Sequence, residues 1–334
     1  MPKRKNPTRP SGLRRLAAET GLSLATISRA LNNSEKVREA TRERVHEAAE
    51  RLGYSPNAAA RALTTRRSRT IGAVIPTLES SIFARFISAI EDQLAADGYA
   101  LVIATTNNDA EIEERRALDL VRMGAEGLIV SGLRHQPGLI RYIKSRGIPT
   151  IATSIFSSRG QLPSIGYDSR LLGQMAARYL ASQGHRNIGV IHGPIANNDR
   201  TRLRLEGIRS VTNNARALEV PLTVAGGVEA TREMLQGDKP PGALLCVSDV
   251  LALGALFEAP RLGFEIPRDL SVMGFDDLDW AASANPPLTT IALPVVEMGR
   301  QSARAIIDNL EHQQPIQGKR LEGHIVERES IRRR

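Results

Sequence analysis

The segment Gly21-Leu-Ser-Leu-Ala-Thr-Ile-Ser-Arg-Ala-Leu-Asn32 decides how the first part of the chain folds. Apolar residues with helical spacing precede it from Leu13 onward, and Gly21 interrupts that spacing, which predicts a first helix that ends in a tight turn. Ser23 is a good N-cap for a second helix over residues 24–31. Two short helices joined by a turn of about four residues are therefore expected.

The residues that follow predict a third helix over residues 41–52, with Gly53 as its C-terminal stop. The second helix offers it an apolar face made of Ile27, Ala30 and Leu31. Three short helices around one core make a helix-turn-helix domain, in which the second helix lies in the DNA major groove.

That geometry assigns the base contacts to Leu24, Ala25 and Arg29. The Arg29 guanidinium can pair with guanine, whereas the other two side chains offer apolar contacts only. Polar side chains better suited to phosphates, which position a protein without specifying sequence, are Thr26, Ser28 and Asn32. Any one of these polar residues taken alone would be interpreted as a solvated surface group.

The positive charge of the chain lies in the same segment. Residues 1–69 hold 16 Lys or Arg against 6 Asp or Glu, whereas residues 70–334 hold 29 against 30. A basic excess confined to one segment favours a polyanionic partner, DNA or RNA, over the alternative of a solubilising tail. Together with the helix-turn-helix geometry, this predicts double-stranded DNA as a partner.

Four segments in this order resemble the headpiece of the lactose and galactose repressor family: the opening segment, TRERV at 41–45, LGYSPN at 52–57 and ARAL at 60–63. The resemblance implies a hinge helix over residues 57–63 that orders on a near-palindromic operator when two subunits pair as a homodimer. It also implies that Leu63 enters the minor groove and bends the DNA, with Asn57 and Arg61 near the backbone. A contact of Leu63 with the core is the alternative.

The chain departs from the family pattern at three positions of the headpiece. Gly12 stands where the family opens its first helix with Thr, and Arg15 stands where it has Asp. Arg38 replaces a Ser that caps the third helix. Arg14 and Arg15 can supply compensating attraction to DNA.

After a basic linker, strand-like apolar runs alternate with amphipathic helical stretches. The runs span residues 71–76, 99–105, 127–132, 148–153, 188–193, 222–226, 243–248 and 270–275. Such alternation predicts parallel sheets covered by helices. The stretch is long for one sheet, so two open α/β lobes with a cleft are expected.

The motifs GYDS at 166–169, SDVLALG at 248–254 and GFDD at 274–277 resemble the effector domain of the same family, which shares the type I periplasmic-binding-protein-like fold. The expected domains are a basic arm (1–10), a helix-turn-helix domain (11–55), a hinge helix and linker (56–69), and an effector-binding and dimerisation domain (70–334). Its first lobe is expected over about 70–165 and 294–322, and its second over about 166–293 and 323–330.

Ligands of such lobes bind beyond the carboxyl ends of strands. The resemblance implies that Asp276 accepts hydrogen bonds from ligand hydroxyls and that Arg204 donates to ligand oxygens. It places Ser248 where the family often has Asn, and Ile82 and Phe83 where the first lobe closes over the ligand. Asn198 adds a polar group to the loop before Arg204.

Five of the six effector assignments have an alternative: a helix N-terminal acid for Asp276, a surface salt bridge for Arg204, a core role for Ile82 and Phe83, and loop solvation for Asn198. Residues 225–231 supply no aromatic ring where relatives stack one on the ligand. The effector is therefore expected to be a sugar or a related metabolite, without a closer identity.

Other function classes fit the sequence less well. The Walker, Gly-x-Gly-x-x-Gly and His-Glu-x-x-His patterns are absent, so we expect no enzyme, cofactor or metal. The single cysteine, Cys246, forms no internal disulfide, and the N-terminus has no apolar stretch of the secretory type, which predicts a cytoplasmic protein off the membrane. An exported solute-binding protein is the alternative. The sequence thus predicts a dimeric, allosteric DNA-binding transcription regulator, and more specifically a repressor.

Overall fold

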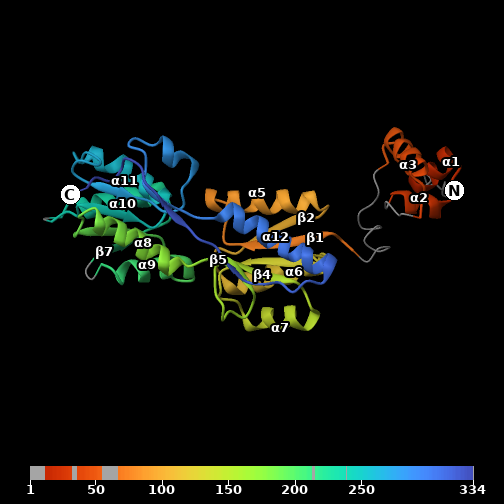
Figure 1. The fold of residues 1–334 in the computed structure, drawn as a ribbon, viewed down its shortest axis with the longest axis horizontal. Coiled ribbons are helices and arrows are strands. Elements are labelled where there is room, and N and C mark those ends of the chain that lie inside the picture. The colour runs from red at the N-terminus through yellow and green to blue at the C-terminus, as the bar shows by residue number, and fades with distance from the viewer. Residues whose placement is uncertain (1–11, 32–35, 55–66, 213–214, 238, 334) are drawn as a thin grey trace, which may run out of the picture. The chain divides into compact units, whose positions relative to one another are not determined.

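The computed structural model describes residues 12–31, 36–54, 67–212, 215–237 and 239–333. Residue contacts divide the chain into two units, 1–68 and 69–334 (Figure 1). The described helices of the first unit are α1 (Gly12–Thr20), α2 (Leu24–Leu31) and α3 (Glu39–Arg51). None of the described helices of either unit is long and apolar enough to cross a membrane.

Local signals set the ends of the three helices of the first unit. Gly21 and Gly53 adopt positive φ values of 65° and 58°, which glycine tolerates without strain. The Oγ atom of Ser23 accepts the backbone N–H of Thr26 at 3.1 Å, which confirms Ser23 as the N-cap of α2. The predicted boundaries of the third helix are close, but α3 begins two residues earlier, after Arg38, whose side chain makes no capping bond.

The three helices share one core. Its buried apolar members are Leu16, Ile27, Ala30, Val37, Val45, Ala48 and Ala49. Tyr54 packs against this cluster and explains the glycine that opens α1, because a Cβ atom on Gly12 would lie only 2.1 Å from Cδ2 of the Tyr54 ring. A residue with a side chain at this position would therefore require the Tyr54 ring to move.

The second unit contains two α/β lobes. Lobe 1 has a parallel sheet in the order β11-β5-β4-β3-β1-β2. Its strands are β1 (Thr70–Ile75), β2 (Ala100–Thr105), β3 (Gly127–Ser131), β4 (Thr150–Ile155), β5 (Ser164–Tyr167) and β11 (Lys319–Arg320). Helices α5 (Ser81–Ala96) and α12 (Val295–His312) pack together on one face, and α6 (Ala110–Arg122) and α7 (Pro137–Arg146) lie on the other (Figure 1).

Lobe 2 has a parallel sheet in the order β7-β6-β8-β9. Its strands are β6 (Ile188–His192), β7 (Arg216–Glu219), β8 (Ala243–Cys246) and β9 (Ser271–Met273). Helices α8 (Ser169–Ser182) and α9 (Asp199–Arg209) pack as one pair, and α10 (Val224–Leu235) and α11 (Asp249–Arg261) pack as another. A short 3-10 helix, η1 (Asp279–Ser283), follows β9, and an antiparallel pair joins β10 (Thr290–Ala292) to β12 (His324–Val326).

The predicted strand at residues 222–226 is wrong. The strand of this region is β7, and Thr223 instead caps α10, because its Oγ1 atom accepts the backbone N–H of Gly226 at 3.0 Å. Gly226 and Gly227 also suit close packing, since a Cβ atom on Gly227 would lie 2.3 Å from the carbonyl oxygen of Leu251 in α11. An apolar run can belong to either element, and here the cap and the glycines select the helix.

Glycines also determine how closely α9 approaches α8. A Cβ atom on Gly173 would lie 2.1 Å from the carbonyl oxygen of Arg204, and one on Gly207 would lie 2.0 Å from that of Arg170. The two backbones are therefore in direct contact. This contact fixes the position of α9, which carries several of the polar residues described next.

Candidate functional site

The first unit presents one face of α2 to solvent. Leu24, with 47% of its surface exposed, lies there with Ala25 and Arg29, whereas Ile27 and Ala30 are fully buried. The three residues predicted to contact bases thus share the exposed side of the helix. Thr26 and Ser28 are half-buried, and the remaining predicted DNA contacts, Asn32, Asn57, Arg61 and Leu63, lie outside the described residues.

The second unit contains a cavity between its lobes, with about 710 Å³ of empty space that includes its opening to solvent. Six residues predicted from the sequence line it: Ile82, Phe83, Asn198, Arg204, Ser248 and Asp276. Lobe 1 contributes Ile82 and Phe83 from the first turn of α5, and lobe 2 contributes the four polar residues. The structure therefore brings together residues that are far apart in the sequence.

Arg204 and Asp276 form a buried ion pair in the cavity wall. The Nη1 atom of Arg204 lies 3.5 Å from Oδ1 of Asp276, and each side chain is only 8% exposed. The same guanidinium donates to the carbonyl oxygen of Val247 at 3.2 Å and lies 4.2 Å from the centre of the Phe275 ring. A surface salt bridge, the alternative considered for Arg204, does not fit this burial.

The polar residues are held by the ends of strands and helices. Asp276 follows β9, and its backbone N–H donates to the carbonyl oxygen of Ile291 at 2.8 Å. Ser248 caps α11 and donates from Oγ to Oδ2 of Asp276 at 2.9 Å. Asn198 caps α9, where its Oδ1 atom accepts the N–H of Thr201 at 3.2 Å. Carboxyl ends of parallel strands thus converge on the cavity, as the fold class leads one to expect.

Burial changes the acid–base behaviour of two carboxyl groups in this region. Burial raises the pKa of Asp276 to about 6, although the Arg204 guanidinium and the Ser248 hydroxyl act in the opposite direction. Burial, and then the nearby Asp276 charge, raise the pKa of Asp249 to about 7. Asp249 accepts hydrogen bonds from the Leu278 N–H and the Thr290 hydroxyl. The cavity wall therefore gains negative charge as the pH rises toward neutrality.

Several lining residues were not predicted, notably Arg200, Tyr167, Asn108 and Leu222. Arg200 could have been found, because it lies one helical turn before Arg204 and hence on the same face of α9. Tyr167 is the last residue of β5 and belongs to the GYDS motif at 166–169, and its hydroxyl lies 3.5 Å from Nη2 of Arg204. Leu222 lines the cavity with apolar surface and lies three residues before the segment 225–231, where relatives were expected to place an aromatic ring.

Comparisons with known proteins match both units. Residues 13–57 match the family described as bacterial regulatory proteins, lacI family, and residues 177–331 match the periplasmic binding protein-like domain. The HTH-type transcriptional repressor CytR of Escherichia coli K12 is 34% identical over 315 residues, which cover 92% of each chain. The repressor PurR of Proteus mirabilis is 30% identical over 327 residues, which cover 95% of each chain.

Solved structures give the same picture. A LacI-family transcriptional regulator from Silicibacter pomeroyi matches 97% of this chain and all of its own, with a TM-score of 0.86 and 27% identity. The lac repressor dimer bound to operator and the anti-inducer ONPF matches with the same coverage and TM-score and 25% identity. The regulator CelR in complex with cellobiose covers 96% of this chain, with a TM-score of 0.68 and 28% identity.

Proposed function

Because the chain belongs to the lacI family of bacterial regulatory proteins, we propose that it represses transcription from operator DNA under the control of a small effector. The observation that carries this proposal is the cavity between the lobes, where the buried Arg204–Asp276 pair and Ser248 present donors and acceptors opposite the apolar side chains of α5. A few fixed polar groups in an apolar cleft are typical of a small-molecule site.

The exposed face of α2 supports the DNA-binding part of the proposal. Arg29 reads a guanine, and Leu24 and Ala25 make apolar contacts such as one with a thymine methyl group. Phosphate contacts are assigned to Thr26, Ser28 and Asn32, and hinge contacts to Asn57, Arg61 and Leu63. The lac repressor is solved as a dimer on its operator, which supports a homodimer of this chain on a near-palindromic site.

The chemistry of the cavity favours an effector with hydroxyl groups. The ionised Asp276 carboxylate accepts hydrogen bonds from hydroxyls, and the Arg204 guanidinium donates to their oxygens. Phe83 and Leu222 supply apolar surface for the faces of such a molecule. A sugar or a sugar-bearing metabolite has this combination, and the CelR complex with cellobiose shows that a relative accepts one.

We infer that the role is regulatory and not enzymatic, with support from the relatives, which are named as transcriptional regulators. The same names do not favour an exported solute-binding protein. A regulator of chromosomal DNA acts in the cytoplasm, which is the compartment that we propose for this chain.

A thermal-shift screen of sugars, nucleosides and related metabolites on the full chain tests the effector site. Binding raises the free energy of unfolding by about 2.7 kcal/mol when the ligand concentration is 100 times Kd. We expect at least one compound to raise Tm in the wild type, and Asp276→Ala to abolish the shift while DNA binding persists. A shift of equal size in Asp276→Ala would remove this residue from the site.

Selection of DNA sequences from a random pool by the full chain tests the operator proposal. We expect an enriched, near-palindromic site, and an affinity for it that falls steeply with added salt because the basic unit displaces counter-ions. Absence of any enriched sequence would contradict sequence-specific binding.

A further inference from the structure

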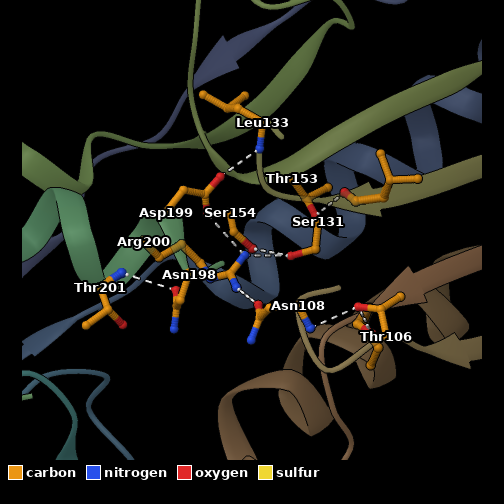
Figure 2. Close-up of polar contacts among 12 residues, drawn as sticks. Thr106, Asn108, Ser131, Leu133, Thr153, Ser154, Asn198, Asp199, Arg200 and Thr201 are labelled. Atoms are coloured by element: carbon orange, nitrogen blue, oxygen red, sulfur yellow. Dashed lines mark hydrogen bonds and ion pairs between the residues drawn. The ribbon is translucent and has the colours of Figure 1, made fainter. Parts of the chain in front are cut away.

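Three hydrogen bonds join the N-terminus of α9 in lobe 2 to lobe 1, beside the effector cavity (Figure 2). Oδ2 of Asp199 accepts the backbone N–H of Leu133 at 2.9 Å. Nη1 of Arg200 donates to Oγ of Ser131 at 3.1 Å, and Nη2 of Arg200 donates to Oδ1 of Asn108. These five residues are called the clasp below.

The charged groups of the clasp are withdrawn from water. The side chains of Arg200 and Asp199 are 11% and 8% exposed, and their nearest charged atoms are 3.7 Å apart. Burial lowers the pKa of Arg200, and the Asp199 carboxylate opposes that change. Hydrogen bonds that involve charged groups are stronger than neutral ones, and a low local dielectric strengthens them further.

The turn after β3 in lobe 1 leaves room for the Asp199 carboxylate of lobe 2. Gly132 lies between Ser131 and Leu133 with φ = 86°, and a Cβ atom there would lie only 2.9 Å from Oδ2 of Asp199. Any other residue would therefore be strained and would collide with the carboxylate. The turn after β3 thus lets a carboxylate from the other lobe approach its backbone.

We infer that the clasp holds the two lobes closed through groups of the chain itself, so that closure does not depend on an effector. Both partners of every clasp contact belong to the protein. Arg200 stands in the wall shared by the 710 Å³ cavity and an adjoining cavity of about 480 Å³, so the clasp acts at the site where the lobes meet. This consequence rests on the proposed effector site. If the lobes are already biased toward closure, less of the binding free energy of the effector is used to close them.

Hydrogen exchange of the full chain, measured by mass spectrometry without any added compound, tests the clasp. The Leu133 amide reports it directly, because the acceptor of this N–H lies in the other lobe. We expect Asp199→Ala to speed exchange at Leu133 by about tenfold or more, and Asp199→Asn, which keeps an acceptor oxygen, to preserve most of the protection. Arg200→Met is expected to speed hydrogen exchange at the same amide, because it removes two of the hydrogen bonds between the lobes.

Arg202→Ala is the matched control, because Arg202 lies in the same helix but is 43% exposed and pairs within the helix with Glu206. It should leave Leu133 unchanged, and peptides from β6 and β8 should report an intact lobe 2 in every variant. If Asp199→Ala does not fold, Asn108→Ala and Ser131→Ala test the clasp from lobe 1. Exchange at Leu133 that is equal in the wild type and in the clasp variants would overturn the inference.

Because this experiment uses no effector, its result is independent of whether the cavity binds one. Small-angle scattering gives a second measure: loss of the clasp in the double variant Asp199→Ala/Arg200→Met is expected to increase the radius of gyration. An unchanged radius would show that other contacts keep the lobes closed, and would also overturn the inference.

Discussion

Replacing Asp276 with Asn tests whether ionisation of this buried carboxyl group lowers the free energy of unfolding. Burial raises the pKa of this carboxyl group from 3.8 to about 6. The folded chain therefore holds the proton more tightly than the unfolded chain does. The resulting stability is fully present below pH ~4 and is lost as the pH rises through about 6. At about 1.36 kcal/mol for each pKa unit, the ionised carboxylate costs the fold about 3 kcal/mol at pH 8.

Asn resembles the protonated carboxyl group in size and cannot ionise. The Asp276→Asn variant should therefore be more stable than the wild type at pH 8. The gain should be smaller by about 1.5 kcal/mol at pH 5, where roughly half of the cost is already present in the wild type. Removing the Asp276 charge also lowers the pKa of Asp249, and this change acts in the same direction.

Urea unfolding at pH 5 and pH 8 measures the effect, with the fluorescence of Trp280 as the signal. This is the only tryptophan of the chain, and it packs against the core of lobe 2, so it reports the lobe that contains Asp276. Separate units unfold independently in many proteins, and a local probe avoids mixing their transitions.

Asp277→Asn is the matched control. Its carboxylate is 26% exposed and bonds to Arg328 at 2.7 Å, so its loss should give no gain in stability at pH 8. The reasoning is refuted if Asp276→Asn is less stable than the wild type at pH 8. That result would mean that Arg204, left without its counter-ion, costs more than the carboxylate does.

Three further predictions address the two units. Arg29→Ala should weaken binding to the selected operator by about 1–3 kcal/mol and relax one base preference in a competition assay, whereas an equal loss on random DNA would indicate a phosphate contact. Gly207→Ala should lower the free energy of unfolding by about 1–3 kcal/mol or more in urea titrations, because it forces apart two helices in backbone contact; Gly237→Ala, where the nearest atom lies 3.9 Å away, should change it by less than about 0.5 kcal/mol. Ser248→Ala removes a hydrogen bond that lowers the pKa of Asp276, so the pH below which effector affinity declines should move upward, and a pH profile unmoved from the wild type would contradict this.

The helices of the first unit could be predicted because their ends depend on local chemistry. Gly21, Ser23 and Gly53 each act on the backbone within a few residues of themselves. Five glycines that follow helices of the second unit likewise have positive φ values: Gly98, Gly124, Gly147, Gly184 and Gly263. Signals of this kind need no knowledge of the rest of the fold.

The sheet of lobe 2 was harder to predict at its edge. Strand β7 exposes much of its surface and carries Arg216 and Glu219 at its ends, so no apolar run marks it. The apolar run at 222–226 was mistaken for the strand, and the helix that begins at Val224 was missed. Edge strands depend on backbone pairing with a neighbour, which apolar composition does not reveal.

Cavity-lining residues of both lobes could be predicted, whereas the hydrogen bonds that join the two lobes could not. Arg200, Arg202 and Arg204 lie on one helix, and helical periodicity separates Arg202 from the other two. Periodicity cannot separate Arg200 from Arg204. Arg204 is held by Val247 and Asp276 of its own lobe, whereas Arg200 is held by lobe 1.

The two lobes contribute different groups to the proposed effector site. Lobe 2 supplies the buried ion pair of the proposed effector site, and lobe 1 reaches the cavity chiefly through apolar side chains of α5 and through the clasp. An effector held firmly by one lobe and lightly by the other changes the relative stability of the open and closed arrangements while leaving the fold of each lobe intact. Effector binding is then coupled to operator binding if the two lobe arrangements differ in their affinity for DNA.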